Sequence, residues 1–280
     1  MKRPEWITAL LLAAVFAPAA LALARVWSSV EHYSHGFLVP LAAGLVAHGI
    51  AQRNAALPAR PDRRGALALA AALVLQVAGV LVGSASGQGL ALVAALAAAI
   101  WWLRGAAWLR ALAFPVAFLL FMVPIPPAWL APVVVQLLLF VSTAAAGVLH
   151  ALGLAVVREG NVIVLPDGQS LFVAEACSGL TSIVTLLPIA VLIAYLAPIG
   201  RGSKIALALL AVPIAMVANL IRVVATSMGA SWWGVEFVTG DTVHALVGLA
   251  VYAIACAALL AVSRVLPRAP ARRTRAAKPA

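Results

Sequence analysis

The sequence predicts an all-α polytopic membrane protein with about eight transmembrane helices, an outer-face re-entrant or interfacial segment and a small extracytoplasmic β-hairpin. Hydrophobic residues make up 65% of the chain and charged residues only 10%, against roughly 25% charged residues in a soluble domain. The apolar residues form runs of about the 20 residues that a membrane-spanning helix needs. The net charge of +11 is spread over short loops between these runs, which is a topology signal. We therefore expect no nucleic-acid partner.

The first half of the chain contains five predicted helices. They cover about residues 6–24, 37–50, 66–82, 90–103 and 111–123. A cleaved signal peptide is the alternative for the first, but its apolar run exceeds a typical signal-peptide core, so we favour an uncleaved helix. Arginine-rich loops after the second and fourth helices mark the cytoplasmic side. The fifth helix ends at Pro124-Ile125-Pro126-Pro127, because proline cannot continue a regular helix.

The next apolar segment, Ala131–Gly153, is long enough to cross the membrane. If it crosses, the basic residues of the later loops and of the C-terminal tail fall outside. If it lies along the outer face or re-enters it, every basic residue except Arg25, Arg158 and Arg222 falls inside. Orientation follows the Lys/Arg bias of the loops, so we predict the second arrangement.

Residues 157–174 interrupt the helical pattern. The runs Asn161–Leu165 and Gln169–Val173, separated by Pro166-Asp167-Gly168, predict a small β-hairpin on the outer side. Three further helices are predicted at about 177–196, 205–225 and 241–262, with an outer loop over 229–240. We expect one integral membrane domain over residues 1–263 and a short basic cytoplasmic tail over residues 264–280.

Three residues are predicted to meet at the outer face. Cys177 opens the sixth helix, where the interface and the positive end of the helix dipole favour a thiolate. Arg222 lies in the last outer turn of the seventh helix, and His244 lies in the first outer turn of the eighth. Because consecutive helices pack roughly 8–10 Å apart, these side chains can converge. A thiolate would attack an acyl carbon, His244 would transfer protons, and Arg222 would stabilise the thiolate or the oxyanion.

Each residue also has a structural interpretation. A lone membrane cysteine usually packs inertly, and an arginine near a helix end usually extends to lipid head groups. Residues predicted to bind substrate or to support the site are Glu175, Ser178, Asn219 and His35. Asn219, three residues before Arg222, could orient the guanidinium. No metal-ligand spacing, Gly-rich phosphate loop or serine-nucleophile elbow is present in the sequence, so we predict no metal and no cofactor.

At these residues the sequence resembles the exosortase/archaeosortase family of membrane-embedded cysteine transpeptidases. The resemblance rests on Glu175-Ala176-Cys177-Ser178-Gly179-Leu180, on Asn219-Leu220-Ile221-Arg222 and on His244. Tyr33-Ser34-His35-Gly36-Phe37-Leu38-Val39-Pro40 and Val156-Val157-Arg158-Glu159-Gly160 are also similar to the family. The match runs from about Trp27 to Val262. Histidine at position 244 is typical of the bacterial exosortases, whereas archaeal relatives tend to carry arginine there.

The resemblance implies a multi-pass protein of the bacterial inner membrane with its active site on the extracytoplasmic face. It implies that Cys177 is the nucleophile and that Arg222 and His244 are its partners. The substrates would be secreted proteins whose C-terminal sorting tail has a Pro-Glu-Pro-type motif, an apolar helix and a basic cluster. The enzyme would cleave at the motif and pass the acyl group to an acceptor. The resemblance implies that the acceptor comes from extracellular polysaccharide machinery. Membrane lipid is the other expected partner.

Two other functions fit the same residues. The first is a transporter or channel for a glycan or lipid-linked intermediate, with Arg222 as an anion contact. A transporter needs an ionisable pathway through the membrane, and apart from the outer cluster the predicted helices are nearly free of charge. The second is a thiol acyltransferase acting on lipid-linked sugars, which would use the same cysteine. We favour the transpeptidase.

Overall fold

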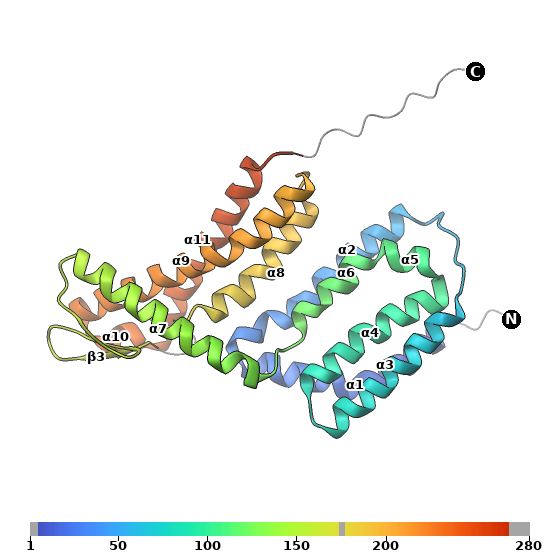
Figure 1. The fold of residues 1–280 in the computed structure, drawn as a ribbon, viewed down its shortest axis with the longest axis horizontal. Helices are drawn as coiled ribbons and strands as arrows, with labels where there is room; N and C mark the ends of the chain where they lie inside the picture. Colours follow the sequence, from blue (N-terminus) through green and yellow to red (C-terminus); the bar gives the residue numbers. More distant parts are fainter. Residues whose placement is uncertain (1–4, 174–176, 269–280) are drawn as a thin grey trace, which may run out of the picture. The chain divides into compact units, whose positions relative to one another are not determined.

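The computed structural model describes residues 5–173 and 177–268, and Figure 1 shows its path. The protein is a polytopic all-α membrane protein with a small three-stranded antiparallel sheet. In the described part of the chain, seven helices are long and apolar enough to cross a membrane, and Ala113–Met122 and Leu180–Leu196 are shorter apolar helices. The chain divides into two compact units, Met1–Pro132 and Val133–Ala280, which are described separately.

The first unit is built of helices only. Its elements are α1 (Glu5–Ser29), η1 (Glu31–Phe37), α2 (Leu38–Arg53), α3 (Arg63–Leu81), α4 (Ala85–Arg104), α5 (Ala106–Ala111), α6 (Ala113–Phe118) and η2 (Leu119–Met122). Side chains from α1, α3 and α4 form its core, and most of those on α4 are alanines. Small side chains let membrane helices approach closely. The resulting dispersion contacts stabilise the helix packing, because no hydrophobic effect drives helices together in lipid.

The starts of α3 and α4 follow from their capping residues. The Asp62 carboxylate accepts a hydrogen bond of 2.9 Å from the Arg64 backbone N–H, at the start of α3. The same carboxylate accepts a bond of 3.1 Å from the Trp101 indole and so ties α3 to the end of α4. Ser84 caps α4 by accepting from the Gly87 backbone N–H at 3.1 Å. Each cap satisfies a backbone N–H that has no partner within its own helix.

Two expectations for the first unit are corrected. The segment Glu31–Gly36, expected to be a polar loop, belongs to the 3₁₀-helix η1, which continues directly into α2. The fifth predicted helix, about residues 111–123, is divided into the end of α5, α6 and η2. Pro115 lies in the first turn of α6, where its missing N–H is tolerated, so the helix restarts at Ala113.

Three ring side chains hold the chain where α6 and η2 end. The Trp27 indole donates to the Met122 carbonyl at 2.9 Å. Tyr33 Oη accepts from the Ile125 backbone N–H at 2.8 Å. His35 Nε2 donates to the Phe121 carbonyl at 3.1 Å. These bonds satisfy backbone groups that lose helical partners before Pro126, and they give the polar stretch around Tyr33 a structural role.

The second unit combines a sheet with a bundle. Its elements are α7 (Pro127–Ala151, whose first residues belong to the first unit), β1 (Val157–Glu159), β2 (Val162–Val164), β3 (Ser170–Phe172), α8 (Leu180–Leu196), α9 (Arg201–Trp233), α10 (Val235–Thr239) and α11 (Asp241–Val265). The predicted hairpin is present as β2 and β3, with Ile163 opposite Leu171. The sequence did not predict β1, which adds a third antiparallel strand and is exposed at all three residues.

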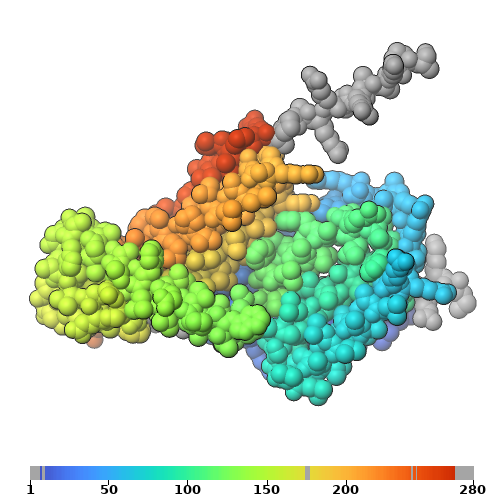
Figure 2. Space-filling view, in the orientation of Figure 1, coloured from blue at the N-terminus to red at the C-terminus, as the bar shows by residue number. Residues whose placement is uncertain are grey.

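The second unit has two buried clusters. The three-helix core consists of buried residues of α8, α9 and α11 together with Ile199. The sheet-end cluster consists of buried residues of α7, the segment 156–173 that contains the sheet, the last third of α9, and Val238 of α10. Figure 1 shows α8, α9 and α11 side by side, with α7 and the sheet at one end of them. In Figure 2 the green to yellow-green atoms of α7 and the sheet gather at that same end.

Helix α7 packs in the sheet-end cluster. Four of its residues are buried there, Val141, Ala145, Ala146 and Leu149, and the three-helix core contains none of α7. Ser142 is fully buried, and its hydroxyl donates to the Gly160 carbonyl in the β1–β2 turn at 3.0 Å. The sheet therefore rests on one face of this helix.

Two boundaries in the second unit differ from the expectation. The predicted outer loop over 229–240 is the end of α9 followed by α10. Gly229 is a helical residue at a close approach and not a turn residue, since a Cβ there would lie 3.1 Å from Val238 Cγ1. Helix α8 begins at Leu180 and not at Cys177. Helix α11 ends at Val265, and the part of the predicted tail beyond Arg268 lies outside the described residues.

Candidate functional site

Cys177 lies in the short connection between β3 and α8, three residues before the first residue of α8. The cysteine is half-buried and packs against the sheet-end cluster, as Met216 and Leu220 of α9 also do. It therefore sits where the sheet-end cluster meets the helical bundle. The next residue, Ser178, is fully buried, and its hydroxyl accepts from the Leu180 backbone N–H at 3.2 Å. Ser178 thus shapes the start of α8 and supports the connection that carries the thiol.

Gly179 brings this connection against α9. Its φ of +93° lies in the left-handed region that favours glycine. A Cβ at this position would also lie 2.9 Å from Met216 Sδ and 3.4 Å from Asn219 Nδ2. Both the turn and the close approach to α9 therefore require glycine two residues after the cysteine.

Asn219 fixes the backbone of Cys177. Its side chain is fully buried in α9, and its Nδ2 donates a hydrogen bond of 2.7 Å to the Cys177 carbonyl. In the part of the chain that the structure describes, its Oδ1 has no hydrogen-bond partner. A polar amide in a membrane helix is expensive to bury, so its place beside the cysteine indicates a role in the site.

Arg222 follows Asn219 by three residues, so the two residues lie on the same face of α9. The guanidinium packs on α11 at Gly248, where a Cβ would lie 3.2 Å from Nη2 and 3.3 Å from Cζ. Any larger residue at position 248 would displace the guanidinium or separate the helices. Arg222 is therefore held between α9 and the backbone of α11.

His244 lies four residues before Gly248 on α11. Residues four apart share a helix face and are about 6 Å apart along the axis. The backbone of α11 thus places position 244 one turn from the Arg222 guanidinium, on the face that Gly248 presents to it. The side chain of His244 is outside the described part of the structure.

The predicted site residues differ in what the structure describes of them. The structure places five of them near the start of α8, in the later part of α9 and in the first turn of α11. They are Cys177, Ser178, Asn219, Arg222 and the backbone of His244. Glu175 lies outside the described residues. His35 belongs to the first unit, where its ring binds the Phe121 carbonyl.

Two residues of this region were not predicted from the sequence. Gly248 stands alone in the apolar run of α11, and an isolated glycine in a helix is a signal of close packing that could have identified it. Met216 carries no such signal, because a methionine in an apolar helix fills space in most proteins. Its contact with Gly179 depends on how α8 docks on α9.

Among the described residues of the second unit, four basic residues lie at the end of the bundle away from the sheet. They are Arg201 and Lys204 at the start of α9 and Arg264 and Arg268 at the end of α11. The two ends are joined, since the Gly200 backbone N–H donates to the Pro267 carbonyl at 3.1 Å. The other described arginines of this unit, Arg158 and Arg222, lie in β1 and in the later part of α9. Charge thus distinguishes the two ends of the bundle.

One comparison with known proteins identifies a family for this chain. The family model described as Transmembrane exosortase matches residues 27–261, which is the greater part of the chain and includes Cys177, Asn219, Arg222 and His244. No curated protein and no solved structure matches the chain. The family match confirms the resemblance predicted from the motifs around these residues. The chain belongs to the transmembrane exosortase family.

Proposed function

We propose that the protein is a membrane-embedded cysteine protease/transpeptidase that cleaves the C-terminal sorting tails of secreted proteins. One observation carries the proposal: Asn219 binds the backbone of Cys177, while Arg222, one turn further along α9, packs on α11 one turn from His244. A nucleophile, a fixed cation and a candidate acid–base group are thereby carried by three adjoining elements. General acid–base and nucleophilic catalysis require three such groups to come together around the substrate.

The first chemical step forms a thioester. The Cys177 thiolate attacks the scissile carbonyl carbon, and negative charge develops on the carbonyl oxygen, where the Arg222 guanidinium stabilises it. When the tetrahedral intermediate collapses, the C–N bond breaks. The leaving amine takes a proton from the His244 imidazolium. The tail departs and the remainder of the substrate stays on sulfur as a thioester.

The second step transfers the acyl group. A hydroxyl or amine of the acceptor, or water, loses a proton to the neutral His244 as it attacks the thioester carbon. The C–S bond then breaks and the Cys177 thiolate leaves. Arg222 stabilises the second oxyanion as it did the first. The enzyme returns to its starting state, with no redox change.

The site is proposed to face out of the cytoplasm of the bacterial inner membrane. Loops rich in Lys and Arg stay on the cytoplasmic side, and the basic end of the second unit lies away from Cys177. The packing of α7 supports this topology, because a helix that rests on the sheet-end cluster lies at the outer end of the bundle. A substrate tail with an apolar helix would then present its preceding motif beside Cys177.

The proposal is tested by trapping the thioester. A secreted reporter with a Pro-Glu-Pro-type motif, an apolar helix and a basic cluster is co-expressed with each enzyme variant. The wild type and Cys256→Ser should process it, since Cys256 lies in the three-helix core away from the site. Cys177→Ser and Cys177→Ala should not. Hydroxylamine should release the reporter from wild-type enzyme as a hydroxamate, as a thioester requires.

Two outcomes would reject the mechanism. Processing by Cys177→Ala would exclude a cysteine nucleophile at this position. An enzyme–reporter adduct that resists hydroxylamine would exclude a thioester, even if processing depended on Cys177.

A further inference from the structure

Two glutamines are buried between the helices of the first unit. Gln76 lies on α3 and is 3% exposed, and Gln88 lies on α4 and is 6% exposed. Among the described residues, no protein group bonds to Gln76 Oε1, Gln76 Nε2 or Gln88 Oε1, and all three atoms are buried. A buried amide without hydrogen bonds is unfavourable, in a membrane helix as in a soluble protein. These three atoms therefore indicate a ligand that bonds to them.

The packing of α3 on α4 brings the two side chains together. A Cβ at Gly79 of α3 would lie 2.9 Å from the Gln88 backbone nitrogen and 3.1 Å from Gln88 Cγ. The Gln88 side chain therefore starts against α3 at Gly79. Gln76 precedes Gly79 by three residues on the same buried face of α3. In this antiparallel packing, Gln76 lies opposite Ala91, which is one turn, or about 4.5 Å along the axis, from Gln88.

Helix α1 closes the interface around the two amides. The core that α1 shares with α3 and α4 includes Ala72 and Ala91, each one turn from one of the glutamines. A Cβ at Gly89, the residue after Gln88, would lie 3.2 Å from Cδ2 of Leu23, which is fully buried on α1. The space at the amides is therefore bounded by protein and suits only a small ligand.

The same segment offers no charge to a ligand. The sequence has no charged residue between Arg64 and Arg104, which covers nearly all of α3 and α4. An ion bound at the two glutamines would have no countercharge from these helices, and burying an unpaired charge is far more costly than burying an amide. The site therefore selects a neutral molecule that both donates and accepts hydrogen bonds.

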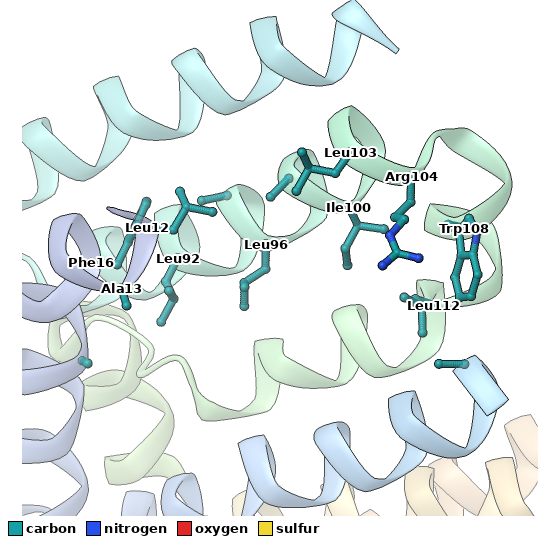
Figure 3. Close-up of a pocket in the computed structure, with 14 residues that line it drawn as sticks. Leu12, Ala13, Phe16, Leu92, Leu96, Ile100, Leu103, Arg104, Trp108 and Leu112 are labelled. Carbon is teal, nitrogen blue, oxygen red and sulfur yellow. The ribbon is translucent and has the colours of Figure 1, made fainter. Parts of the chain in front are cut away.

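A cavity elsewhere in the first unit has the opposite character. It has a volume of about 700 Å³, and the two glutamines do not line it. Figure 3 shows leucine, alanine and phenylalanine side chains along most of its wall, with Arg104 and Trp108 at one end. Apolar cavities stay dry, whereas a buried water molecule needs roughly two to four polar partners. Gln76 and Gln88 provide three buried polar atoms.

We propose that Gln76 and Gln88 bind ordered water between α3 and α4. Each Oε1 accepts a hydrogen bond from water and Gln76 Nε2 donates one, so the three buried atoms all gain partners. Ordered water satisfies polar groups inside membrane helices in other proteins as well. Helix α3 ends at Leu81, five residues after Gln76, so water has a route of roughly 8 Å from the end of the helix. The water joins α3 to α4 across an interface that is otherwise apolar.

The first experiment observes water at the amides of the full-length protein in detergent. Glutamine side chains are isotopically labelled at nitrogen, and the Gln76 and Gln88 peaks are assigned by their loss from the spectra of Gln76→Met and Gln88→Met. We expect the Gln76 Nε2 protons to show cross-peaks to water of opposite sign in NOESY and ROESY spectra, as bound water gives. Gln169, exposed in the β2–β3 turn, is the comparison, because exchange with bulk solvent gives cross-peaks of the same sign in both.

The second experiment tests whether the two amides share the water. Gln76→Met and Gln88→Met each remove one amide with little change of shape, and the double variant removes both. We expect each single variant to lower the thermal unfolding midpoint by about 2–4 °C, because the other amide and the water lose a partner. The double variant should lose less than the two single losses add up to, since no amide is left to satisfy. Gln136→Met, at an exposed glutamine of α7, is the control and should leave the midpoint unchanged.

Three results would overturn the proposal. A higher midpoint in Gln76→Met would show that its amide is dry and unpartnered. Strictly additive losses in the double variant would show that the two amides share no ligand. Coupled losses without water cross-peaks would assign the coupling to a direct bond between the amides. Neither experiment uses processing of a substrate, so the water site can fail while the proposed transpeptidase activity stands, and the reverse.

Discussion

Asn219 shows how one buried amide sets the position of a catalytic candidate. It is fully buried in α9, and its bond to the Cys177 carbonyl joins two residues that are 42 positions apart in the sequence. Burying an amide is unfavourable unless its groups are hydrogen-bonded. The bond therefore satisfies the Nδ2 group of the amide and restrains the connection that carries the thiol.

We predict that Asn219→Leu lowers the rate of thioester formation by about 10- to 100-fold, because a displaced nucleophile loses its near-attack geometry. Asn219→Asp should behave in the same way, since an ionised carboxylate cannot donate to the Cys177 carbonyl. The rate is measured in single turnovers, together with the rate of Cys177 alkylation by a small reagent. A changed rate of Cys177 alkylation would show that the thiol has been repositioned. An unchanged rate would assign the slower processing to a general loss of protein.

The matched control for Asn219 is Ser227→Ala. Ser227 is also fully buried on α9, but its hydroxyl bonds to the Val223 carbonyl of its own helix at 2.9 Å. The Ser227→Ala variant should leave the rate of thioester formation and the rate of Cys177 alkylation near those of the wild type. If Asn219→Leu also matched the wild type, Asn219 would have no positioning role.

A substitution at Gly248 tests the role of Arg222 without replacing the arginine itself. A methyl group at Gly248 would lie 3.2 Å from Nη2, so Gly248→Ala should push the guanidinium away from α11 and lower turnover by at least about tenfold. Arg222→Lys should lower turnover as well, because an ammonium lacks the planar fork. Both are measured with the reporter and with a thermal unfolding scan.

Gly147→Ala is the control for Gly248→Ala. Gly147 is in α7, and no atom lies within 4 Å of a Cβ built there. Alanine at this position should be neutral or stabilising by about 0.5–1 kcal/mol, as in any open helix interior. Unchanged turnover in Gly248→Ala would show that the guanidinium has no fixed position in catalysis.

At the scale of elements, the start of α8 is the feature that most affects the site. The sequence suggested that the helix begins at Cys177, whereas Leu180 is its first residue. Ser178 and the left-handed Gly179 form the connection instead, and Gly179 packs on Met216 and Asn219 of α9. The thiol is thus held by a turn against a neighbouring helix and not within a helix of its own.

We predict that Gly179→Ala destabilises the protein by more than Gly168→Ala. Both glycines have positive φ, +93° and +84°, so both variants carry the strain of about 1–2 kcal/mol expected for alanine in that region. A Cβ at Gly179 would also lie 2.9 Å from Met216 Sδ, whereas nothing lies within 4 Å at Gly168. The difference between their thermal unfolding midpoints isolates the packing of α8 on α9. Equal midpoints would contradict the close approach.

At the scale of the whole chain, charge and packing lead to the same topology. The basic residues at the start of α9 and at the end of α11 lie at one end of the second unit, and α7 contributes buried residues to the cluster at the other end. A crossing by α7 would place these basic residues on the outer side, against the usual Lys/Arg bias. We therefore propose that α7 remains at the outer face, although its length would permit a crossing.

This topology predicts that both ends of α7 react from outside the cell. In a Cys177→Ala, Cys256→Ala background, single cysteines replace Trp129 and Leu152, which are 73% and 58% exposed. Both should react with a membrane-impermeant reagent in intact cells. A cysteine in place of Ala55, exposed in the arginine-rich loop, should react only after permeabilisation. Protection of the Leu152 position until permeabilisation would show that α7 crosses.

The sequence by itself determined the features that depend on local composition. The apolar runs predicted most helices, alternation around Pro166-Asp167-Gly168 predicted the hairpin of β2 and β3, and the motifs around Cys177 predicted the family that the match to residues 27–261 shows. These features follow from solvation, backbone propensity and short-range turn chemistry, which neighbouring residues specify.

Only the tertiary structure decided which residues meet. The contact of Arg222 with Gly248, the bond from Asn219 to Cys177 and the bond from Trp27 to Met122, 95 positions away, join separate elements. The tertiary structure also decided that β1 joins the sheet and that α9 continues past Gly229, which packs against Val238. Such contacts depend on the faces that helices turn toward one another. Apolar runs in a membrane carry little periodicity to specify those faces, because lipid and protein interior are similarly apolar.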